Sequence, residues 1–341
     1  MAKSKVKRDL LNIGIVGMGN IGNVHARCYG NNPHTKVIAV CDLIKQRADR
    51  AAEAYGAQAF YSVKDMLESG LSLDACSVTT AGKENGGDHF DPTMQLLGTG
   101  LPVLGEKPIS NEIPKARKMV NEAHKKKVPY AINLNHRFTP SAKRAKEWLD
   151  TGKMGDLHMI NMTMWINNPN ESSPHFHMRA LHPHSIDVMR YFAGEVGRVH
   201  AFFKKGTGRR IWSNVQVNLL FKSGTIGHLT GSYDAGGSFG LETCELVGSE
   251  ARAVIEEACE ALTWYPRKSN EVQRFEHLGG MQSFGDTFQS RINAWIEDLR
   301  SEASPAEIDG RAEDALKAQL VIEAAIQSWN TKSVVTVPAL R

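Results

Sequence analysis

A glycine-rich turn directly after an apolar run is the feature that most restricts how this chain can fold. Residues 11–16 read LNIGIV, a run typical of a strand buried on both faces of a parallel sheet. The following GxGxxG turn leads into a helical pattern. There a pyrophosphate can approach bare backbone and meet the N–H groups that begin the helix. We therefore predict a dinucleotide site at Gly17, Met18, Gly19, Asn20, Ile21 and Gly22.

An aspartate after the second predicted strand supports this prediction. Asp42 follows the apolar segment 36–41 and lies twenty residues after Gly22. A carboxylate at that position can accept hydrogen bonds from both ribose hydroxyls of the adenosine. The next residue is the neutral Leu43, so a 2′-phosphate would face negative charge without an adjacent arginine. The pair predicts NAD rather than NADP as the cofactor.

Strands and helices alternate through the first part of the chain. This rhythm implies right-handed crossovers and a doubly wound parallel sheet, with ligands beyond the carboxyl ends of the strands. We predict an N-terminal Rossmann domain over residues 1–133. The expected strands are 11–16, 36–41, 74–79, 102–104 and 129–133, and the expected helices are 46–55, 92–98 and 113–126.

The pattern changes after about residue 150, where several strands follow one another without helices between them. We predict an α+β domain over residues 134–341 with a large, open, predominantly antiparallel sheet. The C-terminal helix can pack back on the first domain. One sheet face can take a helix around 185–192 and the other a second subunit, which favours a homodimer or homotetramer. The expected strands are 158–166, 199–204, 214–221, 224–233, 243–247, 251–256, 260–264 and 334–337, and the closing helices are 284–301 and 311–329.

Composition narrows the partners and the compartment. The length of 341 residues favours two domains. The net charge of +4 is spread along the chain, and its one lysine run, 125–127, is predicted to be a solvated helix end rather than a nucleic-acid site. Five cysteines without a short-spaced pair indicate reduced thiols in a cytoplasmic protein. No window has the roughly 18 apolar residues that a membrane helix requires, so we expect no membrane partner.

A lysine held before a proline is the candidate acid–base group. Lys107 lies between Glu106 and Pro108 at a predicted strand end, which directs its side chain over the carboxyl edge of the sheet. An ordinary lysine, with a pKa of about 10.4, is a poor base at neutral pH. Burial beside a positively charged nicotinamide would lower that pKa and let the lysine take a hydroxyl proton. Taken alone, the motif would favour a surface lysine in a turn.

Several motifs lie at spaced positions along the whole chain: GIVGMGNIG, Asp42, Thr79-Thr80, His89, EKP at 106–108, NHRF at 135–138 and HSID at 184–187. Through these motifs the chain resembles, from end to end, the Gfo/Idh/MocA family of oxidoreductases. The resemblance implies a Rossmann domain followed by a domain with an open sheet, Lys107 as the catalytic lysine, and His184 as the histidine at the reacting hydroxyl or carbonyl. It also places Thr79, Thr80, His89 and Glu106 at the cofactor.

Two departures from the family pattern affect the site. Many members have an aspartate four residues before the site histidine, where this chain has Ala180, and His182 replaces a small residue. Alanine cannot relay a proton, so either His182 takes part of that role or the substrate is held differently. The loop 81–88 is longer than the usual connection and is expected to reshape the pocket beside the nicotinamide.

Four histidines fall within ten residues, at positions 175, 177, 182 and 184. Such spacing can bind zinc or manganese. The segment 174–183 is predicted to be a loop entering a helix, and no cysteine is near, so we predict no metal. His184, with His182, is instead expected to be catalytic. Asp187 either orients His184 or caps the helix.

The remaining candidates concern the substrate. Arg137 lies at the predicted domain junction, and Trp165 can stack on a sugar ring, although a strand tryptophan also suits a core. With Lys107, His184 and Asp187 they form the predicted substrate site. We predict an NAD-dependent oxidation of a secondary hydroxyl on a sugar, inositol or glycoside. The alternatives are an NAD-dependent glycoside hydrolase or lyase acting through transient sugar oxidation, and a cofactor-binding regulator without catalysis.

Overall fold

The computed structural model describes residues 9–83, 87–235 and 241–340. The chain divides into two compact units, and each is described by itself. Unit 1 contains Met1–Asn133 and Phe288–Leu316. Unit 2 contains Leu134–Thr287 and Lys317–Arg341.

Unit 1 is built on a six-stranded parallel sheet in the order β3-β2-β1-β4-β5-β6. The strand order reverses between β1 and β4, where a doubly wound sheet binds ligands. This confirms the predicted Rossmann topology. The strands are β1 (Leu11–Val16), β2 (Thr35–Cys41), β3 (Gln58–Phe60), β4 (Ala75–Val78), β5 (Val103–Gly105) and β6 (Tyr130–Ile132). The helices are α1 (Asn20–Gly30), α2 (Lys45–Tyr55), α3 (Val63–Glu68), α4 (Phe90–Gly98) and α5 (Ile113–Lys126).

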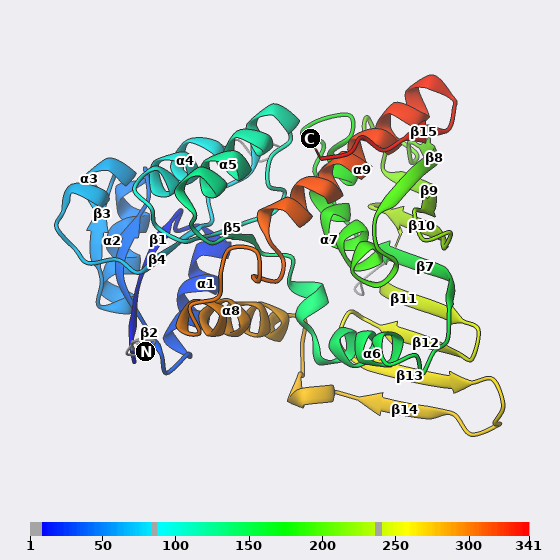
Figure 1. Cartoon of the computed structure of the whole chain (residues 1–341). Coiled ribbons are helices and arrows are strands. Elements are labelled where there is room, and N and C mark those ends of the chain that lie inside the picture. The colour runs from blue at the N-terminus through cyan, green and yellow to red at the C-terminus, as the bar shows by residue number, and fades with distance from the viewer. Residues whose placement is uncertain (1–8, 84–86, 236–240, 341) are drawn as a thin grey trace. The chain divides into compact units, whose positions relative to one another are not determined.

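Helices cover both faces of this sheet. Figure 1 shows α4 and α5 on one face, and α1 with α8 (Gly285–Arg300) on the other. Tyr29 of α1 and Trp295 of α8 are fully buried in the same apolar cluster as Ile13 and Ile15 of β1. Unit 1 therefore takes part of its core from residues far along the chain. At the end of α5, the lysines at 125–127 are exposed, as predicted for a solvated helix end.

Unit 2 is built on a nine-stranded sheet in the order β14-β13-β12-β11-β7-β10-β9-β8-β15. Among its described strands only β7 and β10 pair in parallel, so the sheet is predominantly antiparallel, as predicted. The strands are β7 (Leu157–Trp165), β8 (Val196–Lys204), β9 (Asn214–Phe221), β10 (Ile226–Ser232), β11 (Leu241–Gly248), β12 (Ala251–Glu256), β13 (Ala261–Pro266), β14 (Gln273–Glu276) and β15 (Val335–Thr336). The helices are η2 (Asn135–Phe138), α6 (Pro140–Asp150), α7 (Phe176–Ala193), η3 (Leu278–Gly280) and α9 (Ala312–Thr331).

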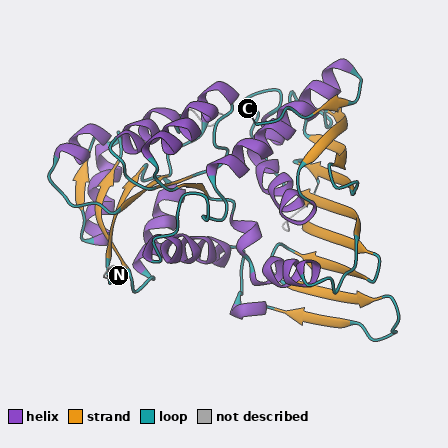
Figure 2. Ribbon diagram, viewed as in Figure 1, coloured by secondary structure: helices purple, strands orange, loops and turns teal. Residues whose placement is uncertain are grey.

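The helices of unit 2 gather on one face of the open sheet (Figure 2). Residues of α6, α7 and α9 share one apolar cluster with the inward residues of the strands, because alternate strand positions face the same side. Outward positions of β7, β8 and β10 expose large apolar side chains. Met159 is 39% exposed, Phe202 56% and Ile226 52%.

The helix α7 corrects the prediction of a loop over residues 174–183. It runs from Phe176 to Ala193 with Pro183 inside it. An interior proline costs a helix about 3 kcal/mol, and burial of nearly the whole helix from Leu181 onward offsets this cost. Since α7 begins at Phe176, Asp187 lies well inside the helix and the alternative that it caps the helix is wrong.

Candidate active site

The glycine turn of unit 1 has the shape that its sequence predicts. A Cβ on Gly22 would lie 1.9 Å from the Gly17 carbonyl oxygen, and one on Gly17 would lie 2.6 Å from the Thr80 nitrogen. Larger residues cannot form this close approach. A Cβ on Gly19 would meet no described atom within 4 Å, and Asn20 and Ile21 then begin α1. Bare backbone and the start of a helix thus remain available, which fits a pyrophosphate.

Asp42 ties this turn to the end of β2. Its Oδ2 accepts the Met18 N–H at 2.7 Å, and its Oδ1 accepts the Ile44 N–H at 2.8 Å. Each oxygen keeps a second lone pair for a hydroxyl, so the carboxylate still suits an adenosine ribose. Thr79 also stabilises the turn, because its hydroxyl donates to the Gly17 carbonyl at 2.6 Å. Leu43 is 87% exposed beside Asp42.

His89 links two loops at the carboxyl edge of the sheet. Its Nδ1 lies 2.8 Å from the Pro108 carbonyl oxygen and its Nε2 lies 2.9 Å from the Thr80 carbonyl oxygen. The Thr80 hydroxyl donates to the Asp88 carbonyl at 2.8 Å. The buried His89 ring therefore fixes the backbone immediately after Lys107.

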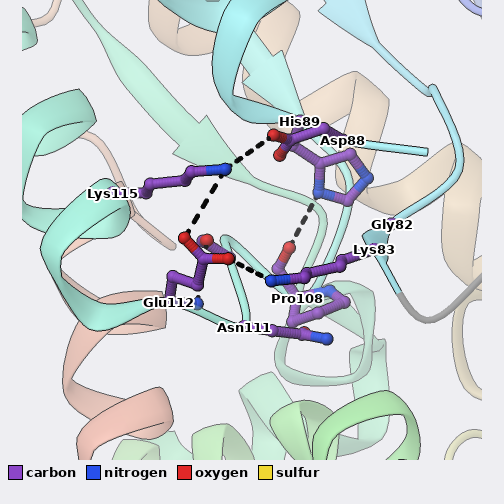
Figure 3. Close-up of a pocket in the computed structure, with 9 residues that line it drawn as sticks. Gly82, Lys83, Asp88, His89, Pro108, Asn111, Glu112 and Lys115 are labelled. Atoms are coloured by element: carbon purple, nitrogen blue, oxygen red, sulfur yellow. Dashed lines mark hydrogen bonds and ion pairs between the residues drawn. The ribbon is translucent and has the colours of Figure 1, made fainter. Parts of the chain in front are cut away.

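Figure 3 shows the small pocket beside this ring, lined by the following residues: Gly82, Lys83, Asp88, His89, Pro108, Ser110, Asn111, Glu112 and Lys115. Lys83 pairs with Glu112, while Lys115 lies 3.0 Å from Asp88 and 3.5 Å from Glu112. These side chains are all about one third or more exposed, so the pairs contribute little to stability. Residues 84–86 of the long loop lie outside the described residues.

A hydrogen-bonded carboxylate lies next to Lys107. Glu106 Oε1 lies 3.0 Å from His25 Nε2 and accepts from Asn133 Nδ2 at 2.6 Å, while Oε2 accepts the Lys107 N–H at 3.1 Å. Burial opposes charge on Glu106, but the His25 bond and charge, the Lys107 charge and the Asn133 bond together hold its pKa below the ordinary value. Burial lowers the pKa of Lys107, and the Glu106 charge partly offsets this. At physiological pH a larger fraction of Lys107 is therefore neutral than of a surface lysine, so Lys107 can accept a proton more readily.

Two hydroxyls lie behind His25, the partner of this carboxylate. Burial raises the pKa of Tyr29, so its hydroxyl stays protonated, and it lies 2.8 Å from Ser77 Oγ in a bond that either oxygen can donate. Ser77 Oγ in turn lies 3.1 Å from His25 Nδ1. The sequence prediction missed His25 and Asn133. The position of each residue could have indicated it. His25 lies about one helical turn after Gly22, and Asn133 follows β6, which pairs with β5, the strand that precedes Lys107.

In unit 2, two predicted substrate residues bind each other. Arg137 donates from Nε to Asp187 Oδ2 at 2.7 Å, a second bond joins the same groups, and both side chains are buried. The Arg137 guanidinium also lies 5.2 Å from the centre of the Tyr191 ring. Trp165, half-buried at the end of β7, has an Nε1 with no partner among the described residues. Met164, the residue before it, is buried on the helix-covered face of the sheet, so Trp165 faces the other side and is not brought together with Arg137 and Asp187.

His184 stacks on a second histidine. Its ring centre lies 4.1 Å from that of His136, with 14° between the planes. His136 Nδ1 lies 2.8 Å from Glu242 Oε1. Sequence reasoning listed His136 among possible donors to a substrate but missed Glu242, which is separated from His136 by 106 residues and reaches it only through the sheet.

His182 is fully buried in a chain of neutral donors and acceptors. The Ser185 hydroxyl donates to Met164 Sδ at 3.3 Å, so Ser185 Oγ accepts from His182 Nδ1 at 3.0 Å. His182 Nε2 then accepts from His177 Nε2, also at 3.0 Å. Burial lowers the pKa of His177 to about 3, and burial and His177 hold that of His182 well below its ordinary value. The pair is therefore neutral at physiological pH.

The same pair explains a glycine on β10. A Cβ on Gly231 would lie 2.1 Å from His182 Nε2, so a larger residue does not fit there.

No group of three His, Cys, Asp or Glu side chains within the described parts of the chain is arranged to hold a metal ion. Among the described helices, none has the length and apolar character to cross a bilayer.

A Rossmann unit with an intact dinucleotide turn, a strand-end lysine and a second unit with an open sheet define an NAD-binding oxidoreductase. Two models of one family match the chain: "Oxidoreductase family, NAD-binding Rossmann fold" over residues 11–134 and "GFO/IDH/MocA C-terminal domain" over residues 142–254. The chain belongs to the GFO/IDH/MocA family, as its motifs predicted. Its cofactor is NAD, and it is a dehydrogenase by family.

Named relatives cover this chain to different extents. Inositol 2-dehydrogenase of Rhizobium meliloti is 22% identical over 95% of this chain and 98% of its own length. Myo-inositol 2-dehydrogenase of Thermotoga maritima is 24% identical over 94% and 97%. The rhizopine catabolism protein MocA of Rhizobium meliloti is 28% identical, but the match spans 54% of this chain and 57% of MocA.

Solved structures share the fold. Levoglucosan dehydrogenase in complex with NADH and L-sorbose has a TM-score of 0.86 at 17% identity, covering 97% of this chain and 100% of that one. A putative myo-inositol dehydrogenase from Sinorhizobium meliloti has a TM-score of 0.80 at 22% identity, covering 96% and 100%. At these identities the likeness concerns the fold.

Proposed function

We propose that this protein oxidises a secondary hydroxyl of a sugar, inositol or glycoside, with Lys107 as the acid–base group and His184 assisting. The observation that carries the proposal is Lys107 itself, which follows β5 at the carboxyl edge of the sheet and has a pKa lowered by burial. Relatives named as inositol and glucoside dehydrogenases support the substrate class.

The residues of unit 1 would have separate roles in this reaction. The turn at 17–22 and Asp42 would hold the dinucleotide, with Thr79, Thr80 and His89 fixing the surrounding backbone. A bound NAD⁺ would supply the acceptor for the hydride that leaves the substrate carbon. Neutral Lys107 takes the hydroxyl proton, so a carbonyl is left. The Glu106 carboxylate stabilises the ammonium that forms, and in reduction the ammonium returns the proton.

The residues of unit 2 would hold the substrate. Arg137, fixed by Asp187, would orient hydroxyls of the substrate. His184 would donate to the reacting oxygen. His182 is proposed to assist from within the protein, because its partners are His177 and Ser185.

The test is turnover on a panel of polyols, sugars and glycosides with NAD, followed by the absorbance of NADH. Lys107→Ala should lower kcat by roughly 10²- to 10⁴-fold, the range of a general base, while NAD still binds. Lys126→Ala, at the exposed end of α5, is the matched lysine control and should behave like the unchanged protein. Turnover that survives Lys107→Ala, or none across the panel, would contradict the proposal.

A second candidate is a glycoside hydrolase or lyase that oxidises the sugar transiently. It needs another base to take the neighbouring C–H proton, and His136 Nε2, which has no partner among the described residues, is such a nitrogen. Release of the aglycone without net formation of NADH would decide for this function.

We also propose a homodimer or homotetramer formed through the outward face of the open sheet in unit 2, where Phe202 and Ile226 are exposed. Phe202→Lys should then shift the sedimentation coefficient toward the monomer. A cytoplasmic location is proposed from the five buried cysteines, whose spacing contains no CxxC pair.

A further inference from the structure

The glutamate next to Lys107 receives two hydrogen-bond donors on one oxygen. Glu106 Oε1 lies 3.0 Å from His25 Nε2 and accepts from Asn133 Nδ2 at 2.6 Å. The other oxygen, Oε2, accepts the Lys107 backbone N–H at 3.1 Å. His25 is fully buried, Asn133 is 1% exposed and Glu106 is 7% exposed. The carboxylate therefore has a fixed place beside the lysine and is largely shielded from water.

The contacts of His25 determine which of its ring nitrogens donates. The ionised carboxylate of Glu106 can only accept, so His25 Nε2 carries a proton. The other nitrogen, Nδ1, lies 3.1 Å from Ser77 Oγ, and a hydroxyl can either donate to a neutral ring or accept from a charged one. In both charge states of the ring, therefore, Nε2 donates to Glu106.

Other titratable groups surround these hydrogen bonds. Those in the described part of unit 1 are Tyr29 and Cys28 on α1, Cys76 on β4, His89 before α4, and Arg291 on α8. Burial raises the pKa of Tyr29, so its hydroxyl stays protonated, and raises the pKa of Cys76 to about 12. Burial lowers the pKa of Lys107, whereas the Glu106 charge raises it. Glu106 is therefore the charged group whose state bears on Lys107.

Loss of a proton from Lys107 changes the surroundings of Glu106. While the lysine is protonated, the buried carboxylate has a counter-charge beside it. Once the lysine is neutral, the carboxylate has lost that counter-charge, and burial opposes its remaining charge. The two N–H donors stabilise the carboxylate most in this state. Removing a donor should therefore make the pair keep its proton to higher pH.

We propose that His25 and Asn133 are positioning residues that keep the Glu106 carboxylate ionised while Lys107 is neutral, so that the lysine carries the exchanged proton. This inference rests on the proposed function. The proton balance is that of the oxidation: the substrate O–H bond breaks, the Lys107 amine gains the proton, and the hydride leaves the carbon with its electron pair. His25 and Asn133 gain and lose no proton in this step.

The test measures the protonation of Lys107 directly, so it does not depend on turnover. The protein is labelled with a trace of acetic anhydride at a series of pH values, and mass spectrometry of the peptide reports acetylation of Lys107. Only the neutral amine reacts, so the midpoint of the curve follows the pKa of Lys107. His25→Leu and Asn133→Leu each remove one donor and should raise this midpoint by about one pH unit.

Two further variants separate this effect from a folding defect. His25→Gln keeps an N–H donor near the place of Nε2 and should restore most of the shift. His124→Leu is the matched control, because His124 also pairs with a glutamate, Glu313, but is 54% exposed. It should leave the Lys107 midpoint unchanged. An unchanged or lower midpoint in folded His25→Leu and Asn133→Leu proteins would overturn the inference.

A double variant tests whether the effect passes through Glu106. In Glu106→Gln there is no carboxylate to stabilise, so adding His25→Leu should cause no further shift of the Lys107 midpoint. A further rise as large as in the unchanged protein would overturn the inference, because His25 would then act on the lysine by another route.

Kinetics separate this outcome from failure of the proposed function. In an active enzyme, the rise of kcat with pH should move to higher pH by about one unit in His25→Leu. The shift in Glu106→Gln should have the opposite direction, because the lost charge lowers the pKa of Lys107. Absence of all turnover in the unchanged protein, with the labelling shifts present, would overturn the proposed function and leave the coupling of His25 and Asn133 to Lys107 standing.

Discussion

Each unit contains a buried glutamate beside a histidine, and the two pairs differ in how completely they are hydrogen-bonded. Glu106 in unit 1 is hydrogen-bonded to His25, Asn133 and the Lys107 N–H. The other ring nitrogen of His25 is hydrogen-bonded to Ser77. Glu242 in unit 2 holds His136, whose other nitrogen has no partner among the described residues. A saturated pair fixes charge and tunes a neighbour, whereas an unsaturated pair keeps a nitrogen available for chemistry.

The largest expected difference between the units is in how much folding stability each loses at low pH. His177 has a folded-state pKa of about 3 against an ordinary 6.5, so the unfolded chain binds more protons between these values. Unit 2 should therefore lose stability as pH falls from 6.5 toward 3, by about 5 kcal/mol for this one residue. The lowered pKa of Glu106 acts with the same sign, but only below about its ordinary 4.5. Hydrogen exchange resolved by peptide should show unit 2 opening first, and His177→Phe should flatten the loss.

A change in packing should destabilise unit 2 selectively. In Gly231→Ala the new methyl group would overlap His182, whose Nε2 lies 2.1 Å from the ideal Cβ position, and overpacking of this kind costs about 1–3 kcal/mol. Gly30→Ala in unit 1 is the control, since its Cβ would meet no described atom within 4 Å. Denaturant unfolding should show a lower midpoint for the first variant and an equal or higher one for the second.

Removing the charge of Glu106 should change the pH dependence of turnover. That charge raises the pKa of Lys107 against the effect of burial. In Glu106→Gln the pKa of Lys107 should fall further, and the rise of activity with pH should move to lower pH by about one unit. An activity profile that keeps its position in a folded variant would show that Glu106 does not tune the lysine.

The smallest effect is expected at the surface pocket of Figure 3. Lys83 is 61% exposed and pairs with Glu112. Lys83→Ala should leave the thermal midpoint of unfolding unchanged, because exposed ion pairs are screened by solvent. A clear loss would mean that this pair, unlike the other exposed ones, orders the neighbouring backbone.

Most elements could be predicted from the sequence, including the short strands β5 and β6, whereas two other short strands and the helix α6 were missed. The run at 11–16 and the helix at 113–126 have the bounds that their patterns predicted. The three-residue strand β3 and the four-residue strand β14 have too few positions to show a period. The helix α7 was hidden by Pro183, since local preference argued against it and burial in the tertiary structure decided the outcome.

The candidate site divides in the same way. The turn at 17–22 and Asp42 lie close in sequence and carry a spacing that can be read directly. The contacts of His25 with Glu106 and of His136 with Glu242 span 81 and 106 residues. Such pairs depend on strand order and register, which a single sequence specifies only through the completed fold.

The helix α8 has a consequence for how the protein is made. Its buried Trp295 and Ile292 complete the apolar cluster around Tyr29, yet they lie more than 250 residues later in the chain. Because synthesis runs from the N-terminus, the emerging Rossmann unit exposes this surface on the ribosome until translation is nearly finished. A nascent chain stalled before residue 288 should therefore depend on chaperones, even though all six strands of its first sheet have already been made.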